Sequence, residues 1–411
     1  MSPAKGHAGK GLQMTSATAP NALVQVQTPA VTGQSLIETV ARRFKVNPFR
    51  QFVEMFRMKG GRNQMSAREY YEFEIYSPSY TQAQKREFVG EKGNYTLNLT
   101  LSPPTLTQIR SFLADKVGLT TMMAGLGLPT TRLQAAFAPT RGFGTLRTLR
   151  SADDVVDFLI HHARFPLFGK PIRGAQAIGS VMILGVDAAA GTARLGTGET
   201  VALTQVAAEV ASNTLYGYVF QDAVPVHPDI ARLSGSPAVS TVRVVTINTT
   251  GTPEVLYTVW KLPSPSAMSD NFWQKGSLLC LVDKTSGVVQ RVRHGSGLNT
   301  EWLENHPVTG AQINGITLPD WQSVLDLALA AHATVPDSGL LGWDIALTPN
   351  GALLIECNEN TGHAFYQLAA SRGILNADFL PVFDRIKARN TAFSRAFHER
   401  RMAYQKAKYR F

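Results

Sequence analysis

The sequence predicts an α+β fold, because segments typical of helices and of strands are mixed along the chain and several strand pairs flank tight turns. Hairpin turns are expected at Thr250-Gly251, Ser286-Gly287 and Asn350-Gly351, which favours antiparallel pairs over a doubly wound parallel sheet. The 411 residues correspond to two or three domains of about 150 residues. Two cysteines that lie far apart, Cys280 and Cys357, exclude a disulfide framework and favour a reducing, cytoplasmic compartment.

The N-terminal part divides into a lead and a helical region. Residues 1–34 are expected to be a disordered lead, because Ser, Thr, Ala, Pro, Gln and Gly dominate there. Residues 35–104 are expected to be mainly helical. Core packing is the favoured interpretation of the apolar residues in the first two helices, and a basic face that docks on a membrane surface or a partner is the alternative. These helices are broken at Asn47-Pro48, and their apolar residues recur at helical spacing: Leu36, Val40 and Phe44, then Phe49, Phe52, Met55 and Phe56.

The later helices and strands are predicted from the spacing of their apolar residues and from the Gly and Pro residues that end them. A helix is expected from Thr105 to Leu126, where Gly127-Leu128-Pro129 ends it. Further helices are expected to begin at Ala152, Leu203 and Pro319, and a last helical region near Phe365. Short apolar runs bounded by turn residues predict strands at Leu133–Phe137, Leu167–Pro171, Val181–Val186, Tyr216–Gln221, Ser240–Asn248, Glu254–Lys261, Leu278–Asp283, Val288–His294, Gly342–Leu347 and Ala352–Cys357.

The net charge of +10 is concentrated at the two ends of the chain. Residues 1–62 carry nine Lys or Arg and two acids, and residues 385–411 carry nine Lys or Arg and one acid. Residues 63–384 have a net charge of −5. This distribution argues against a nucleic-acid-binding core and indicates basic flanks that contact an anionic partner, such as an acidic glycan or a membrane surface. No run of about 18 apolar residues is present, which excludes an ordinary transmembrane helix.

The most informative segment is 341–362, which reads as two strands joined by the turn at Asn350-Gly351. Glu356 and Asn358 are two apart and share one face of their strand, and the turn brings Asp344 of the other strand toward them. Two carboxylates and an amide oxygen suit Mg²⁺, which is often held by one or two carboxylates plus substrate phosphates. Two solvated acids on a surface hairpin are the alternative interpretation.

A family resemblance rests on this hairpin and on three other stretches. The pattern D-x11-E-x-N, followed by Thr361-Gly362, resembles the metal-binding signature of ATP-grasp enzymes. Within that superfamily the chain resembles the sugar-transfer associated ATP-grasp group, through FGKPIRGAQAIGS (168–180), STVRVVTI (240–247) and DNFWQKGSLLCLVDKTSG (270–287). The resemblance covers about residues 66–384 and implies an ATP-grasp fold, in which two α+β subdomains grip ATP, preceded by the helical N-terminal region.

The resemblance also implies the domain boundaries and the cofactors. The N-terminal ATP-grasp subdomain is expected at 105–225, the C-terminal subdomain with the metal site at 226–384, and a basic helix or tail at 385–411. The expected cofactors are ATP and Mg²⁺. Two Mg²⁺ ions would be held by Asp344, Glu356 and Asn358.

The nucleotide contacts carried over by the resemblance are two lysines, a glycine-containing loop and a hinge. Lys170 is expected to reach the ATP phosphates, and the loop with Gly174 and Gly179 to cover them, because glycines let backbone N–H groups approach oxyanions. Lys116 is expected to contact the nucleotide as well, with a solvated helix lysine as the alternative. The hinge for adenine corresponds to residues 218–228, with candidate contacts at Gln221, Asp222, Val224 and His227.

Arg243 and Lys261 are the expected catalytic residues. Arg243 lies among β-branched residues in a strand, where a buried arginine needs an anionic partner, and the resemblance places it at the γ-phosphate or the acyl-phosphate. Many ATP-grasp ligases carry an arginine two residues before the first metal-binding acid. Here that position is Gly342, so Arg243 and Lys261 must supply the positive charge.

The function implied by the resemblance is ATP- and Mg²⁺-dependent joining of a carboxylate to an amine through an acyl-phosphate, on small molecules or on a glycan or peptide precursor. A kinase of a sugar or polyol hydroxyl and a non-catalytic nucleotide-binding protein remain as alternatives. No nucleic-acid partner is expected. The basic ends are expected to contact an anionic surface, so removal of residues 385–411 should weaken docking at low salt and spare ATP turnover.

Overall fold

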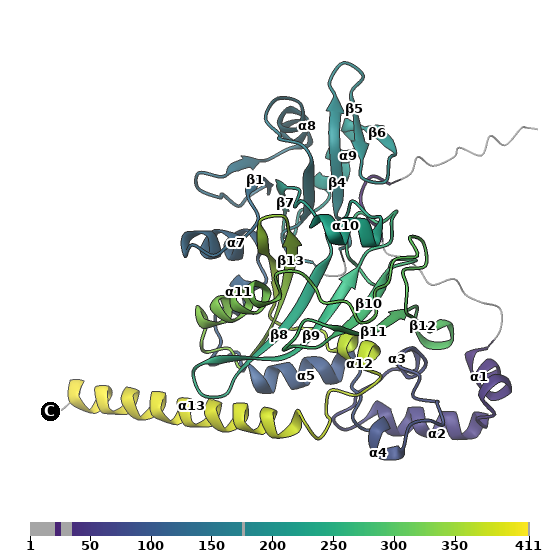
Figure 1. Cartoon of the computed structure of the whole chain (residues 1–411). Helices are drawn as coiled ribbons and strands as arrows, with labels where there is room; N and C mark the ends of the chain where they lie inside the picture. Colours follow the sequence, from purple (N-terminus) through teal and green to yellow (C-terminus); the bar gives the residue numbers. More distant parts are fainter. Residues whose placement is uncertain (1–20, 26–34, 175–176, 410–411) are drawn as a thin grey trace, which may run out of the picture.

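Two β-sheets with helices packed against them form the body of the protein (Figure 1). The computed structural model describes residues 21–25, 35–174 and 177–409. The first sheet has the strand order β2 (Arg147–Leu149), β1 (Leu133–Phe137), β7 (Tyr218–Asp222), β3 (Leu167–Pro171), β4 (Val181–Asp187), β5 (Thr192–Leu195) and β6 (Thr200–Ala202). The second has the order β12 (Glu301–Leu303), β11 (Val289–His294), β10 (Leu278–Val282), β9 (Pro253–Leu262), β8 (Thr241–Asn248), β13 (Leu340–Thr348) and β14 (Gly351–Asn358). Antiparallel pairing dominates both sheets, and the α+β fold class is confirmed.

The first sheet buries one face against two helices, α8 (Ala152–His161) and α9 (Leu203–Ala211). Both helices present their apolar stripe to strands β3, β4 and β7, and α8 begins with a capping box made by Ser151 and Asp154. The other face of this sheet is directed toward the second sheet. Residues that alternate along β3 and β7 therefore divide between a helix-covered core and the space between the sheets.

The second sheet is covered on both faces. One face packs on α11 (Trp321–Ala333), α7 (Lys116–Gly125) and α10 (Pro228–Ser234). The other face packs on the N-terminal helices and on α12 (Ala364–Ala370) and the first turns of α13 (Leu380–Lys408). Strand β8 is buried along its whole length, because Val242 and Val244 point into one of these cores and Val245 and Ile247 into the other.

The helical N-terminal region is confirmed, and it packs directly on the second sheet. It consists of α1 (Leu36–Phe44), α2 (Pro48–Lys59), α3 (Ala67–Glu72), α4 (Gln82–Lys85) and α5 (Glu91–Leu101). The break at Asn47-Pro48 is where α2 begins, with the Asn47 side chain accepting the Phe49 N–H. The expectation that the phenylalanines of α2 pack in a core is wrong, since Phe49, Phe52 and Phe56 are exposed.

Three other expectations need correction. The helix expected over 105–126 is two helices, α6 (Arg110–Leu113) and α7, because Asp115 leaves the helical conformation and caps α7 through the Gly118 N–H. The prediction of a disordered lead is wrong for residues 21–25, which hydrogen-bond to Glu209 and to the loop at 179–180. Residues 1–20 and 26–34 lie outside the described residues. The basic helix or tail expected at 385–411 is part of a helix that begins earlier, α13, which buries Ile386 and Asn390.

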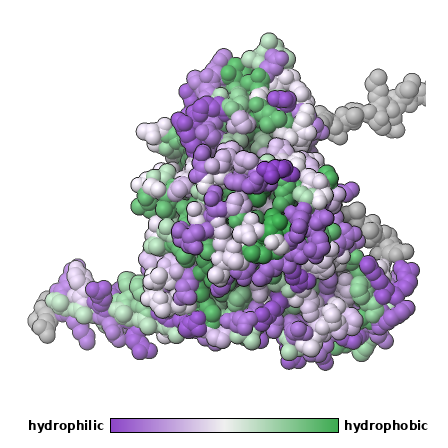
Figure 2. Space-filling view, in the orientation of Figure 1, coloured by the Kyte–Doolittle hydropathy of each residue, from purple (hydrophilic) through white to green (hydrophobic). Residues whose placement is uncertain are grey.

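The last part of α13 extends away from the body (Figure 1). From Thr391 to Tyr409 every residue is exposed. Figure 2 shows hydrophilic and hydrophobic residues side by side on this projecting helix. Within the described ranges, no helix is both long enough and apolar enough to cross a membrane.

Candidate functional site

The β13–β14 hairpin places the two predicted metal-binding acids opposite each other. Asp344 and Glu356 are direct partners in the antiparallel register. One step further the register shifts, so that Ile345 pairs with Leu354 and Ile355 is an extra residue, a β-bulge. Cys357 is buried in the core on the far side, as its place between Glu356 and Asn358 requires. The bulge lets Ile355 and Glu356, although adjacent in sequence, both take part in the same site.

A nearly fully buried ion-pair network surrounds Asp344. Arg243 Nη2 lies 2.9 Å from Asp344 Oδ2, and Arg243 Nε donates to Asp344 Oδ1. Lys261 Nζ lies 2.9 Å from the same Oδ2. Burial by itself raises the pKa of the Asp344 carboxyl, but the two cations outweigh it and hold that pKa well below its usual range. Asp344 is therefore ionised and already carries two positive partners.

Asp270 is a member of this network that the sequence reasoning missed. Lys261 Nζ lies 2.9 Å from Asp270 Oδ2, so Lys261 bridges Asp270 and Asp344. Thr241 Oγ1 also donates to Asp270. Burial lowers the pKa of Lys261, and the two carboxylates reverse that effect and raise it. Asp270 begins the stretch DNFWQKG, which carried part of the family resemblance, but it follows an irregular loop whose position no local pattern predicts.

The two lysines predicted to bind phosphate, Lys116 and Lys170, interact with Glu356. Lys116 Nζ, at the start of α7, is 3.6 Å from Glu356 Oε2 and donates to the Gly174 carbonyl at 3.2 Å. Lys170 is buried near the end of β3, and burial lowers the pKa of its ammonium to about 8, with Glu356 opposing that shift. A buried lysine with a weakened proton affinity is a strong site for an additional anion.

The glycine at position 342 has a steric reason. A Cβ on Gly342 would lie 2.1 Å from Thr361 Oγ1 and 3.1 Å from Arg243 Cδ. Strand β8 pairs Arg243 with Asp344 and Val245 with Gly342, so the Arg243 side chain crosses next to the bare glycine. The space beside Gly342 is thus filled first by the Thr361 side chain and then by Arg243 of the neighbouring strand.

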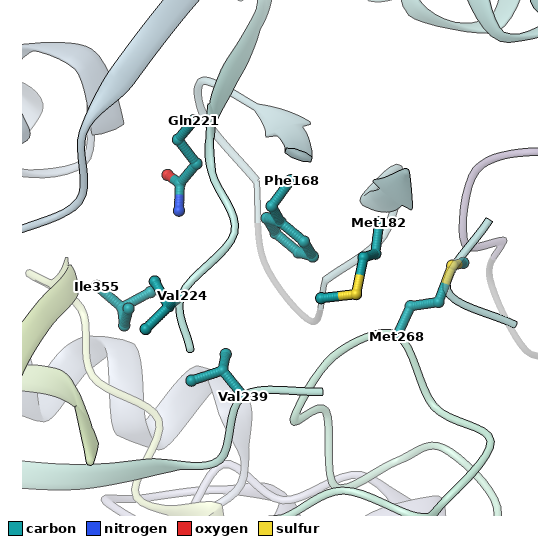
Figure 3. A pocket seen from close by; sticks show the side chains of 7 residues that line it. All are labelled: Phe168, Met182, Gln221, Val224, Val239, Met268 and Ile355. Atoms are coloured by element: carbon teal, nitrogen blue, oxygen red, sulfur yellow. The ribbon is translucent and has the colours of Figure 1, made fainter. Parts of the chain in front are cut away.

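An apolar pocket opens beside the charged network (Figure 3). Its enclosed volume is about 30 Å³, and the surrounding space free of protein atoms is about 320 Å³ when open solvent is included. Its lining side chains come from both sheets and from the loops between them: Phe168, Met182, Gln221, Val224, Val239, Met268 and Ile355. In Figure 3 these side chains point toward one shared space, with the Gln221 amide at one edge. Two predicted hinge residues, Gln221 and Val224, therefore line it.

The pocket and the charged network are contiguous along three segments of chain. Phe168 lines the pocket and Lys170 follows two residues later on the same face of β3, about 7 Å along the strand. Met268 lines the pocket and Asp270 is two residues further. Ile355 lines it and Glu356 is the next residue. A ligand with an apolar planar part and an anionic part would satisfy both regions at once.

Three predicted nucleotide contacts are not brought to this site. Asp222 lies on the helix-covered face of β7, where Gln134 and Arg164 bind its carboxylate at 2.6 and 2.9 Å. Strand alternation explains this, because Gln221 and Asp222 necessarily point to opposite faces. His227 caps α10 through the Asp229 N–H. The Gly179 N–H is taken by the Val24 carbonyl at 2.8 Å, so it has no donor left for a phosphate.

The loop after β14 is held by helix α5, a support that the sequence did not reveal. Asn98 donates to Asn360 Oδ1 and to the Thr361 carbonyl, both at 2.9 Å. His363, fully buried, lies 3.2 Å from Asn98 Oδ1 and 2.8 Å from the Tyr257 hydroxyl. Burial lowers the pKa of His363 to about 3, so the ring is neutral. Helix α5 thus fixes the segment that immediately follows Asn358.

The residues present fit a divalent cation with oxygen ligands. Asp344 and Glu356 face each other across the hairpin, and each carboxylate oxygen has more than one lone pair, so contacts with cations do not exhaust them. Asn358 follows Glu356 by two residues in β14, and its amide oxygen is a ligand type that Mg²⁺ accepts. Across the described ranges no group of three His, Cys, Asp or Glu forms a preassembled metal cluster. This matches a set of two carboxylates and one amide that shares its metal with a ligand.

Comparison with known proteins identifies the family. No curated protein sequence matches the chain. Among solved structures, the D-alanine-D-alanine ligase from Coxiella burnetii is similar at 12% identity, with a TM-score of 0.42 over 72% of this chain and 62% of that one. The L-amino acid ligase from Bacillus licheniformis is similar at 12% identity, with a TM-score of 0.36 over 63% of this chain and 43% of that one. The chain thus spans less than two thirds of the length of either. The sequence model of the sugar-transfer associated ATP-grasp family matches residues 108–380, and the chain belongs to that family.

Proposed function

We propose that this protein is an ATP- and Mg²⁺-dependent carboxylate–amine ligase that works through an acyl-phosphate, on a small-molecule, glycan or peptide precursor in the cytoplasm. The observation that carries the proposal is the continuity between the apolar pocket and the buried charged network. The first suits a purine base and the second suits a polyphosphate. Such an arrangement fits phosphoryl transfer, which needs positioning and charge neutralisation more than a protein nucleophile.

The pocket residues would hold adenine. Phe168, Met182 and Met268 offer apolar contact to the faces of the ring, and the Gln221 side chain offers a polar group at its edge. Thr131 Oγ1 contacts Gln221 Oε1 at 3.3 Å and orients the amide. The adjoining Val224 closes the pocket on the hinge side.

The cations would hold the phosphates. Lys116 and Lys170 interact with Glu356, and Arg243 and Lys261 with Asp344, so the four cations surround the two carboxylates of the hairpin. Mg²⁺, held by Asp344, Glu356 and Asn358, would neutralise charge on the phosphate oxygens. Arg243 and Lys261 are proposed as the catalytic residues, because they are fixed by carboxylates and cost no reorganisation when charge develops.

The chemistry proceeds in two transfers. A substrate carboxylate oxygen attacks the γ-phosphorus, the bond to the β-phosphate oxygen breaks, and ADP leaves with the negative charge. The amine nitrogen then attacks the acyl carbon, the carbon–oxygen bond to phosphate breaks, and inorganic phosphate leaves while the nitrogen loses a proton. Arg243 and Lys261 stabilise the transferring phosphoryl group in the first step and the leaving phosphate in the second.

The test is a phosphate-release screen with purified protein, ATP, Mg²⁺ and pools of amino acids and uronic acids. Phosphate release that requires both a carboxylate and an amine supports the ligase. ADP formation with a sugar or polyol, without phosphate release, would show that the protein is a kinase and not a ligase. Glu356→Ala should abolish turnover with an unchanged melting temperature, whereas Glu199→Ala, an exposed acid beside β6, should not change it. Absence of ATP binding by the wild-type protein would contradict both enzymes.

A further inference from the structure

Helix α2 differs from an ordinary surface helix, because its aromatic side chains face outward and two of its three buried side chains, Gln51 and Glu54, are polar. Phe49, Phe52 and Phe56 are 74%, 61% and 73% exposed. Their spacing of three and four residues puts them on one face of the helix. On the opposite face Gln51 is fully buried and Glu54 is 5% exposed. A helix that folds against a protein core normally has the opposite arrangement.

The orientation of α2 is held by hydrogen bonds that satisfy both the nitrogen and the oxygen of the buried Gln51 amide. Gln51 Nε2 donates to the carbonyls of Ile37 and Val46, at 3.1 and 2.9 Å, and Gln51 Oε1 accepts the Tyr71 hydroxyl at 2.9 Å. Rotation of the helix to bury its phenylalanines would leave these groups without partners, which is costly for a buried amide. The aromatic face is therefore directed outward by the fold.

Glu54 is neutralised mainly from inside the protein. Lys85 Nζ lies 2.9 Å from both of its carboxylate oxygens, and the Tyr70 hydroxyl donates to it at 2.8 Å. From the helix surface, Arg50 Nε donates to Glu54 Oε1 at 3.1 Å. Burial raises the pKa of Glu54, but these partners outweigh burial and lower it. The charge of Glu54 therefore contributes little to the outer surface of α2.

The surface around the phenylalanines is strongly basic. In the segment 35–62, which the structure describes throughout, Glu38 is the only exposed acid. Arg50 and Arg57 flank one side of the aromatic face and Lys59 the other, at helix positions roughly a quarter turn away. The exposed cations of this segment are Arg42, Arg43, Lys45, Arg50, Arg57, Lys59 and Arg62.

We propose that the outward face of α2, formed by Phe49, Phe52 and Phe56 with its basic rim, docks the protein on an anionic membrane surface. Such a surface offers acyl chains that can contact the aromatic rings and anionic headgroups that can pair with the basic rim. In Figure 1, α1 and α2 lie at the end of the molecule opposite the β5–β6 hairpin. Docking through α2 thus leaves the first sheet directed away from the lipid.

A second copy of the chain fits this face poorly. A twofold contact through the phenylalanines would bring the rim residues Arg50, Arg57 and Lys59 of the two copies together, and like charges in contact oppose association. The projecting part of α13 has the same sign, because its residues 391–409 carry five Lys or Arg and one acid. Single-stranded nucleic acid binds basic grooves in which aromatic rings stack bases, and this face is the convex side of one helix.

The experiment measures binding of the full chain to phosphatidylcholine vesicles with and without phosphatidylserine, by flotation at low and high salt. We expect binding that needs phosphatidylserine and falls at high salt. Phe52→Ser/Phe56→Ser should weaken it by roughly tenfold or more, and Arg57→Glu/Lys59→Glu by a similar factor. The matched controls are Leu215→Ser, an 81% exposed apolar residue before β7, and Arg194→Glu, an exposed residue of β5; both should bind as wild type does.

Three results would overturn the proposal. One is an absence of vesicle binding by the wild-type chain, and another is binding that the phenylalanine variants retain in full. The third is retention on single-stranded DNA or a dimer in solution that the same variants abolish, without lipid binding. Unchanged melting temperatures confirm that the variants are folded, because the substituted side chains are exposed. ATP binding should be unaltered in all of them.

Discussion

The substitution Asp344→Asn tests the buried ion-pair network that underlies the proposed site. Asparagine has nearly the same size, so the change removes one negative charge without creating a cavity. Asp344 is 2% exposed, and both of its oxygens contact cations. Among the described residues Arg243 forms its ion pair with Asp344, whereas Lys261 keeps Asp270 as a partner in the variant. The variant therefore leaves one buried cation, not two, without its counter-charge.

The expected loss in the free energy of unfolding follows from the number of buried cations left unpaired. Removal of one partner from a buried pair costs about 3–5 kcal/mol, because the remaining charge stays desolvated. Asp270→Asn is the matched control. The Asp270 side chain is 18% exposed and its loss leaves Lys261 paired with Asp344, so about 1–2 kcal/mol is expected, between an exposed and a buried pair.

Urea unfolding measures both variants. Trp343 and Trp260, each fully buried and each adjacent in sequence to a member of the network, report locally by fluorescence, and far-ultraviolet circular dichroism reports globally. Coincident transitions justify two-state treatment. A loss of less than about 1 kcal/mol for Asp344→Asn would refute the network as a stabilising unit. Tripolyphosphate without Mg²⁺ should bind Asp344→Asn more tightly than the wild type, because Arg243 is freed, and weaker binding would contradict the proposed role of Arg243.

Three further predictions concern the nucleotide site. Because burial lowers the pKa of Lys170 to about 8, ATP binding should weaken about tenfold from pH 7 to pH 9 as the ammonium loses its proton; calorimetry should show no such loss in Lys170→Arg, which stays charged. Gly342→Ala should lower the free energy of unfolding by about 1–3 kcal/mol through the contact with Thr361, whereas Gly185→Ala, in open space, should cost far less by urea titration. Val224→Trp should obstruct the pocket and weaken binding of a fluorescent ATP analogue at least about tenfold, with circular dichroism as the check that the variant is folded.

The hairpin of the candidate site was predictable because its signals are local. Asn350-Gly351 encodes the turn, and the alternation along each strand puts Glu356 and Asn358 on one face. The register set by the turn would pair Asp344 with Ile355, and the bulge brings Glu356 opposite Asp344 instead. The bulge at Ile355 was not predictable, because no residue in the strand marks the extra position.

Asp270 and Asp222 show the limits of local patterns. Asp270 reaches the site from an irregular loop, and only the packing of that loop against β8 and β9 brings it to Lys261. Asp222 was assigned to the hinge, yet the pairing of β7 with β3 directs Gln221 into the pocket and Asp222 to the far face. The direction of a side chain across a sheet depends on which face the partners cover.

The sequence by itself determined the α+β class, the helix break at Asn47-Pro48, the hairpin and the family, because turn chemistry and periodicity act over a few residues. It also determined that α2 has two unlike faces. Only the tertiary structure decided which face points inward, because that choice depends on partners far along the chain, such as Lys85 for Glu54 and Tyr71 for Gln51. Where such partners satisfy buried polar groups, hydrogen bonding outweighs the hydrophobic pattern, and the aromatic residues remain at the surface.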